Sequence, residues 1–142
     1  GIFYGRPDVL TVSIHADPVR FYPFFWGHAD ERGEALGLGY NLNLPLERRT
    51  GDDLFLETLA AGLRRIRSFA PDALVVALGL DPFEGDPFAG LSVTTPGFAR
   101  IGEAIAGLSL PTVIVQEGGY LCNELGANLT SFLAGFGGAH AM

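Results

Sequence analysis

Short apolar runs alternate with longer amphipathic stretches along the chain. Three runs, at 9–14 ("VLTVSI"), 73–79 ("ALVVALG") and 111–116 ("PTVIVQ"), are rich in β-branched residues and have the length of a strand. The last two are apolar throughout, which is typical of strands that are covered on both faces. A fourth run at 41–46 ("NLNLPL") alternates, and it predicts a short edge strand that Pro45 ends.

Apolar residues recur at helical spacing between and after these strands. Residues 52–70 form the first such stretch, with one apolar face made of Leu56, Leu59, Leu63, Ile66 and Ala70. Thr95 and Pro96 predict the N-cap and first residue of a second helix, whose apolar stripe is Phe98, Ile101, Ile105 and Leu108. A third helix follows "EGGY", with a stripe of Leu121, Leu125, Leu129, Phe132 and Phe136.

Strands and helices thus alternate, which predicts an α/β fold, a parallel sheet with helices on its faces, in one domain over residues 1–142. Two helical crossovers predict the strand order 9–14, 73–79, 111–116, with the last strand at an edge. Residues 16–40 are a long, aromatic-rich loop, and a loop of this length in a compact domain is usually functional.

Composition narrows the classes of partner. The net charge is −7, and all nine basic residues are arginines. This balance argues against nucleic acid or an anionic membrane as a partner and is compatible with a cationic small molecule such as a polyamine, although solubility alone would explain it. No apolar run approaches the length of a membrane span. Cys122 is the only cysteine, so no internal disulfide forms and a cytoplasmic location is expected.

The candidate chemistry lies where the strands end, since ligands of α/β sheets bind beyond the carboxyl ends of strands. His15, Asp81 and Tyr120 follow the three strands. Each also has a structural interpretation: a core histidine, a turn-capping aspartate and a packed aromatic. Gly118 and Gly119 would allow close approach of a ligand to the backbone. Chemistry alone predicts an acidic and phenolic site and names no reaction.

Glu84 and Asp86 lie in the acidic loop that follows 73–79. Because both are surrounded by proline and glycine, they are interpreted as turn and solvent residues.

Three motifs, "VLTVSIHADP", "LGLDPFEGDP" and "VIVQEGGY", occur in an order and spacing that resemble the C-terminal half of the histone deacetylase and acetylpolyamine amidohydrolase family. The stretches "GIFYGRPDVLTVSIHADP" and "FYPFFWGHADE" resemble its bacterial acetylpolyamine amidohydrolase branch, and the resemblance covers essentially the whole chain. It implies an arginase-like α/β fold and hydrolysis of N-acetyl amides of the acetylpolyamine or acetyl-lysine type. It also implies that the chain is the C-terminal segment of a longer protein.

The resemblance assigns roles to individual residues. Asp81 would be one of about three protein ligands of a catalytic zinc. Tyr120 would donate to the developing oxyanion, and Tyr22, Gly118 and Gly119 would line the substrate site. Potassium or sodium would bind at the Ser13 hydroxyl and Ile14 carbonyl, and at a second site made by the backbone carbonyls of Phe3, Arg6, Val9 and Tyr40.

The family's other zinc ligands, in a D-x-H motif, and its catalytic His-His pair have no counterpart here, since His15, His28 and His140 match neither motif. Zinc binding by this chain alone is therefore expected to be weak or absent, and the sequence leaves open whether the chain alone is an enzyme. One hypothesis is a segment of a zinc-dependent amidohydrolase that acts on a small acetylated amine. The other is a non-catalytic remnant or assembly module that lacks a complete zinc site.

The edge strand at 111–116 carries a prediction of its own. In the resembling family it would pair with the D-x-H strand, so Val113, Ile114 and Val115 are expected to leave an unpaired apolar edge. Such an edge predicts self-association.

Overall fold

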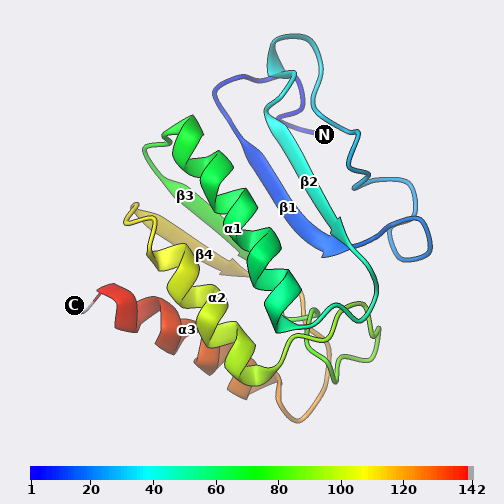
Figure 1. The fold of residues 1–142 in the computed structure, drawn as a ribbon, viewed down its shortest axis with the longest axis vertical. Coiled ribbons are helices and arrows are strands. Elements are labelled where there is room, and N and C mark those ends of the chain that lie inside the picture. Colours follow the sequence, from blue (N-terminus) through cyan, green and yellow to red (C-terminus); the bar gives the residue numbers. More distant parts are fainter. Residues whose placement is uncertain (141–142) are drawn as a thin grey trace.

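The computed structural model describes residues 1–140. Its elements are β1 (Thr11–Ala16), the short 3₁₀ helix η1 (Ala35–Gly37), β2 (Asn41–Leu46), α1 (Asp52–Phe69), β3 (Leu74–Leu78), α2 (Thr95–Ala106), β4 (Thr112–Gln116) and α3 (Leu125–His140). The predicted α/β class with parallel strands and helices is confirmed, and Figure 1 shows the strands running in one general direction behind the helices.

The strands form two separate parallel pairs within the described residues. β1 pairs with β2, Thr11 lying opposite Asn41, and β3 pairs with β4, Leu74 lying opposite Thr112. The predicted pairing of the first strand with the strand at 73–79 is therefore wrong. A helical crossover dictates parallel direction but not adjacency, and β1 takes its hydrogen bonds from the run at 41–46 instead. Because each pair has only two strands, every strand of the described residues lies at an edge, so the edge position predicted for 111–116 stays a prediction.

Pro45 lies inside β2 and does not end it. The Thr11 N–H donates to the Tyr40 carbonyl at 3.0 Å, and the Asp17 N–H donates to the Leu46 carbonyl at 2.7 Å. Successive residues of a parallel strand bond to opposite sides. The odd-numbered residues of β1 therefore bond to β2, while Pro45, opposite His15, points its nitrogen away from β1. The missing N–H of proline costs no ladder bond there.

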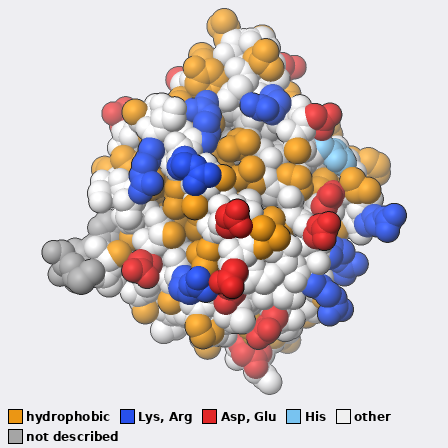
Figure 2. All heavy atoms as spheres, viewed as in Figure 1, with side chains coloured by type: hydrophobic (Ala, Val, Ile, Leu, Met, Phe, Trp, Pro, Cys, Tyr) orange, Lys and Arg blue, Asp and Glu red, His pale blue; other side chains and the backbone are white. Residues whose placement is uncertain are grey.

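The three helices cover one face of the strands. The buried core beneath them includes Phe55, Leu59 and Leu63 of α1, Phe98 and Ile101 of α2, and Phe132 of α3. On the helix-bearing side, Figure 2 shows acidic and basic side chains interspersed with apolar ones.

The opposite face of β3 and β4 is open among the described residues. Val75 is 70% exposed and Val113, directly opposite it, is 61% exposed. Residues 1–140 therefore cover these two strands on the helix side alone, although their sequences are typical of strands covered on both faces.

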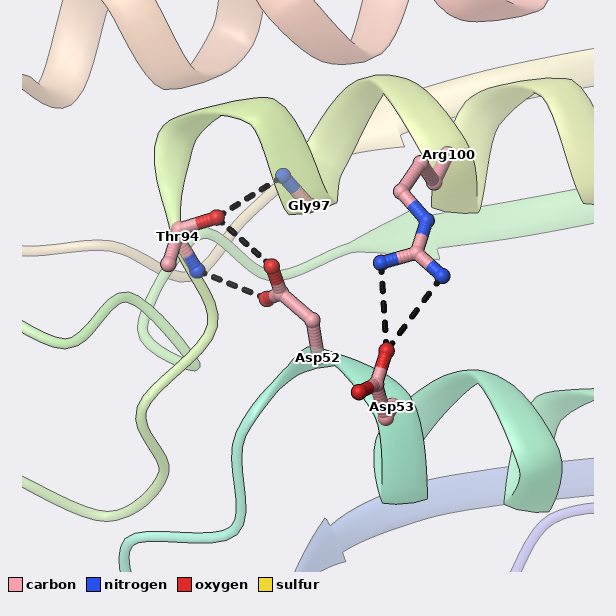
Figure 3. Close-up of polar contacts among 5 residues, drawn as sticks. All are labelled: Asp52, Asp53, Thr94, Gly97 and Arg100. Carbon is pink, nitrogen blue, oxygen red and sulfur yellow. Dashed lines mark hydrogen bonds and ion pairs between the residues drawn. The ribbon is translucent and has the colours of Figure 1, made fainter.

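A cluster of polar side chains joins the N-terminal ends of α1 and α2 (Figure 3). The N-cap of α2 is Thr94, one residue earlier than predicted, since its hydroxyl accepts from the Gly97 N–H at 3.1 Å. Asp52, in the first turn of α1, accepts from the N–H and the hydroxyl of Thr94 at 2.8 and 2.7 Å. Asp53 accepts from Arg100 at 3.3 Å. Asp52 thus satisfies a donor that the start of α2 would otherwise leave free.

None of the helices described over residues 1–140 is long and apolar enough to cross a bilayer.

Candidate functional site

The loops that follow β3 and β4 lie against each other. The Glu117 N–H donates to the Leu78 carbonyl at 3.1 Å, and the Leu80 N–H donates to the Gly118 carbonyl at 2.9 Å. The Gln116 amide also donates to the Gly118 carbonyl, at 2.7 Å. These bonds extend the pairing of β3 and β4 beyond the strands, so Asp81 and Gly118 meet at the strand ends.

Asp81 is packed against bare backbone. A Cβ atom added to Gly79 would lie 2.5 Å from Oδ1 of Asp81, and a Cβ on Gly118 would collide with the same oxygen. The carboxylate therefore occupies the space that side chains at these two positions would need. Glycine at position 118 thus has a steric reason that does not depend on a ligand.

The surroundings of Asp81 disfavour its charge. Burial raises the pKa of this carboxyl above its ordinary value. A hydrogen bond from its own backbone N–H lowers the pKa in part, and the negative charges of Asp86 and Glu117 raise it again. The two ion pairs found within residues 1–140, Arg6 with Asp8 and Arg100 with Asp53, do not involve it. A carboxylate in such a place is suited to bind a cation.

Tyr120 follows a turn that Gly119 makes in the left-handed region, at φ +111°. A Cβ at Gly119 would lie 2.7 Å from Cβ of Leu80, so the turn leaves no room for a side chain. The Tyr120 ring packs edge-on against Phe88, with 4.4 Å between centroids, and the residue is 48% exposed. The turn thus fixes the backbone of Tyr120 while its side chain stays accessible.

Asp86 is the residue that the sequence interpretation missed. It is only 4% exposed, so it is not a solvent residue. Its Oδ1 accepts from the Phe88 N–H at 2.9 Å, and its Oδ2 accepts from the Tyr120 N–H at 3.2 Å. The first bond is a local turn of the kind that Asp-Pro predicts. The second spans the two loops, and no local pattern in the sequence indicates it.

His15 is held by hydrogen bonds on both ring nitrogens. Nε2 lies 2.8 Å from the Gly27 carbonyl and Nδ1 lies 2.7 Å from the Ser13 hydroxyl. Since a carbonyl only accepts, Nε2 carries the proton in this arrangement and Nδ1 accepts from Ser13. His15 therefore joins β1 to the aromatic-rich loop, which supports its structural interpretation.

A cavity of about 500 Å³ lies beside this site. Asp81, Tyr22, Ser13 and Ile14 all border it, so the structure brings together four of the residues singled out in the sequence. The side chain of Tyr22 is exposed. Tyr120 does not border the cavity, since its ring lies against Phe88.

The carbonyls of the second predicted cation site lie in the turns that precede β1 and β2. Phe3 accepts from the Arg6 N–H at 2.9 Å, and Tyr40 accepts from the Thr11 N–H at 3.0 Å. Val9 lies two residues before β1 begins. A carbonyl has a second lone pair, so these bonds leave room for a cation, and both cation sites stay predictions.

A complete zinc site is not formed by the described residues. Nowhere in residues 1–140 do three or more histidine, cysteine, aspartate or glutamate side chains gather as metal ligands would. Asp81 suits one position of such a site, but His15 is engaged elsewhere and Asp86 bonds to backbone N–H groups. The residues of this chain therefore fit a single zinc ligand and not a whole site.

Fold and site together define an α/β protein whose candidate chemistry lies at the carboxyl ends of parallel strands, in a carboxylate after one strand and a Gly-Gly-Tyr turn after the next. Residues 1–136 match the histone deacetylase domain. The chain belongs to this family.

Similar proteins cover nearly the whole chain. An acetylpolyamine amidohydrolase of Burkholderia pseudomallei (strain 1710b) is 54% identical over 136 residues, which are 96% of this chain and 40% of that protein. Acetylpolyamine amidohydrolase 2 of Pseudomonas aeruginosa is 46% identical over 98% of this chain and 40% of its own length. A crystal structure of the acetylpolyamine aminohydrolase from Burkholderia pseudomallei superposes with a TM-score of 0.94, over 97% of this chain and 40% of that one. The chain thus spans about two fifths of the length of these relatives.

Proposed function

We propose that this chain is the part of a zinc-dependent amidohydrolase that supplies Asp81 and Tyr120 to a site for hydrolysing N-acetyl amides of a small amine. The observation that carries the proposal is the joining of the two strand-end loops. The Leu80 N–H donates to the Gly118 carbonyl, and the Tyr120 N–H donates to Asp86. The carboxylate of Asp81 and the phenol of Tyr120 therefore come from two loops that hydrogen bonds hold together. Relatives with 54% and 46% identity are named acetylpolyamine amidohydrolases, which favours an acetylated polyamine as the substrate class.

Each residue has a role that its surroundings suit. Asp81, whose charge is disfavoured by burial, would hold a cation as one carboxylate ligand. The hydroxyl of Tyr120, on a backbone fixed by Asp86, would donate to the amide oxygen as that oxygen gains negative charge. A donor of this kind lowers the barrier by about 3 kcal/mol. Tyr22 would contact the acyl chain from the wall of the cavity, and Gly118 and Gly119 would let the substrate approach the backbone.

Zinc, when bound, would polarise the amide and activate water. Since this chain suits one ligand position, the remaining ligands would come from residues outside it. The same proposal includes potassium or sodium at two sites. One site is formed by Ser13 and Ile14, and the other by the carbonyls of Phe3, Arg6, Val9 and Tyr40.

A chimera tests these roles. This chain replaces the matching residues of the Burkholderia amidohydrolase, and the product is assayed on an acetylated polyamine. Tyr120→Phe should lower kcat by about 100-fold or more with unchanged metal content. Asp81→Asn should lose metal. The matched control is Tyr4→Phe, which removes a hydroxyl away from both loops and should change neither quantity. A fully active Tyr120→Phe chimera would exclude the assigned role.

Elemental analysis of the chain alone addresses the metal separately. We expect clearly less than one zinc per chain, because one carboxylate offers too few ligands to displace water from the ion. Stoichiometric, chelator-resistant zinc on the monomeric chain would contradict this account of Asp81.

A further inference from the structure

The polar face of β1 and β2 carries part of the long loop that joins these two strands. Val12 points toward Gly62 of α1, so the odd-numbered side chains of β1, and those of β2 that lie beside them, point to the opposite face. Figure 1 shows the loop from β1 to β2 returning alongside β2. On the polar face the Asn43 amide donates to the His28 carbonyl of this loop at 3.0 Å. The polar side chains of the two strands therefore hold a loop in place.

Gly27, in this loop, is bound through both of its backbone polar groups. Its N–H donates to Oε2 of Glu31 at 2.7 Å, and its carbonyl accepts from Nε2 of His15 at 2.8 Å. Its backbone lies in the left-handed region, at φ +95°, and a Cβ there would lie 2.7 Å from Nε2 of His15. A side chain at position 27 would displace the imidazole, so only glycine brings the loop this close to β1.

Glu31 is itself fixed to β2. Its Oε2 also accepts from the Asn43 amide at 3.0 Å, and its backbone carbonyl accepts from the Asn41 amide at 2.6 Å. Neither ion pair found within residues 1–140 involves Glu31, so its carboxylate accepts from neutral N–H donors. His15, on β1, and Glu31, bound to β2, thus hold Gly27 from two strands. We call these two residues the Gly27 clamp.

The aromatic segment 22–26 lies between the Gly27 clamp and a second anchor at Phe21. The Phe21 ring packs against Gly90, where a Cβ would lie 3.0 Å from Cζ of the ring, and the Arg48 guanidinium lies 5.2 Å from the ring centroid. The segment between the two anchors has four side chains that are more than half exposed, Tyr22, Phe24, Phe25 and Trp26. Its position therefore depends on the anchors at its ends.

Tyr22 needs these anchors to keep its place beside the cavity. Its side chain is 75% exposed, and no hydrogen bond or ring contact among residues 1–140 fixes its phenol. Tyr22 nevertheless borders the same cavity as His15 and Asp81. A side chain without polar contacts of its own keeps one position only if its backbone is held on both sides.

We propose that His15 and Glu31 are positioning residues of the amide-hydrolysing site, which hold Gly27 and thereby fix the segment 22–26 and the wall that Tyr22 gives to the cavity. Both act through the backbone of the loop and not through contact with the substrate. The inference rests on the proposed function for what Tyr22 contacts. The clamp itself is a property of this chain that is measured without substrate.

Paired substitutions at each position keep or remove the hydrogen bonds to Gly27. His15→Gln retains an amide donor at the place of Nε2, whereas His15→Asn has its amide at the place of Nδ1, beside the Ser13 hydroxyl, and cannot reach Gly27. Glu31→Gln retains an oxygen that accepts from the Gly27 N–H, whereas Glu31→Ala retains none. His15→Asn and Glu31→Ala are therefore the clamp-breaking variants, and the two glutamine variants are the clamp-keeping ones.

The first measurement is the NMR backbone order parameter of Phe25 and Trp26 in this chain alone. In the clamp-breaking variants it should fall from about 0.85 to below about 0.6, because the segment is then held on one side only. The clamp-keeping variants should stay near the higher value. The matched control is Asp30→Ala, which removes a neighbouring exposed carboxylate and should change nothing.

The second measurement uses the chimera with the Burkholderia amidohydrolase. Because Tyr22 would contact the acyl chain equally before and during the reaction, the clamp-breaking variants should raise KM for an acetylated polyamine by about fivefold or more, with kcat within about twofold. Metal content should not change. The clamp-keeping variants should lie closer to the unsubstituted chimera than the clamp-breaking ones do.

Each outcome decides one part of the proposal. High order parameters in both clamp-breaking variants would exclude the clamp, and so would an equal fall in His15→Asn and His15→Gln, since any change of packing would then loosen the loop. A loosened segment with unchanged KM would exclude the positioning role. An inactive unsubstituted chimera would refute the proposed function, and the positioning role with it, while the order parameters would still decide the clamp. If Glu31→Ala does not fold, the pair at position 15 decides.

Discussion

Asp86→Asn tests whether one buried carboxylate holds the Tyr120 turn. Asparagine retains one oxygen, which can keep the local bond to the Phe88 N–H, observed at 2.9 Å. Its amide nitrogen would then face the Tyr120 N–H, so two donors meet where the carboxylate now accepts at 3.2 Å. Losing a hydrogen bond to a charged acceptor in a buried place costs about 1.5–3 kcal/mol.

Two effects reduce this loss. Tyr120 is half exposed, so water reaches part of the turn. The charge of Asp86 also contributes to the raised pKa of Asp81, and its removal relieves repulsion between the two carboxylates. We therefore expect a net loss of about 2 kcal/mol at neutral pH, roughly 6 °C in Tm for a chain of this length.

The assay is thermal unfolding followed by circular dichroism, together with amide exchange at Tyr120. Exchange at Tyr120 should quicken by about tenfold or more, whereas the Phe88 amide should change little. The matched control is Glu84→Gln, an exposed carboxylate in the same loop, which should stay within about 0.5 kcal/mol of the unsubstituted chain. If Asp86→Asn unfolds like that control and the Tyr120 amide is unaffected, then Asp86 does not hold the turn.

Three further predictions concern stability and assembly. The pKa of Asp81 is raised in the folded chain, so Asp81 contributes stability below its unfolded pKa, near 3.8, and loses it as the pH rises through the folded value. Metal-free Asp81→Asn should therefore be more stable than the unsubstituted chain at neutral pH, with the difference vanishing in acid; a less stable variant at neutral pH would contradict the dominant role of burial. Thr94→Ala should lower the free energy of unfolding in urea by about 1–2 kcal/mol, and Thr94→Ser, which keeps the hydroxyl that caps α2, by much less; equal losses would exclude the cap as the cause. We also propose that the chain self-associates through the open edge and face of β4, which light scattering over a concentration series would detect and Val113→Lys should reduce; a monomer at high concentration would contradict it.

The secondary structure can be predicted from the sequence because its causes are local. The helix predicted at 52–70 is α1 over Asp52–Phe69, and the strands predicted at 73–79 and 111–116 are β3 and β4 with slightly shorter bounds. Asp81 and Tyr120 were singled out because they directly follow strands. The direction of the strands followed from the helical crossovers between them.

Strand pairing and long-range polar contacts cannot be predicted from local sequence patterns. Nothing in the run at 9–14 distinguishes a neighbour at 41–46 from one at 73–79, since both provide apolar residues at suitable spacing. Asp86 was misjudged for the same reason, because its partner Tyr120 lies 34 residues later in the chain. A carboxylate between glycine and proline has the composition of a solvated turn whether or not a distant N–H reaches it.

The continuous apolar runs indicate that β3 and β4 have apolar side chains on both faces. They do not indicate which part of the protein covers each face. An apolar run indicates that a strand is covered on both faces, and the helices cover the inner face of β3 and β4 through residues such as Leu78. Val75 and Val113 show the same need on the outer face, where residues 1–140 supply no cover.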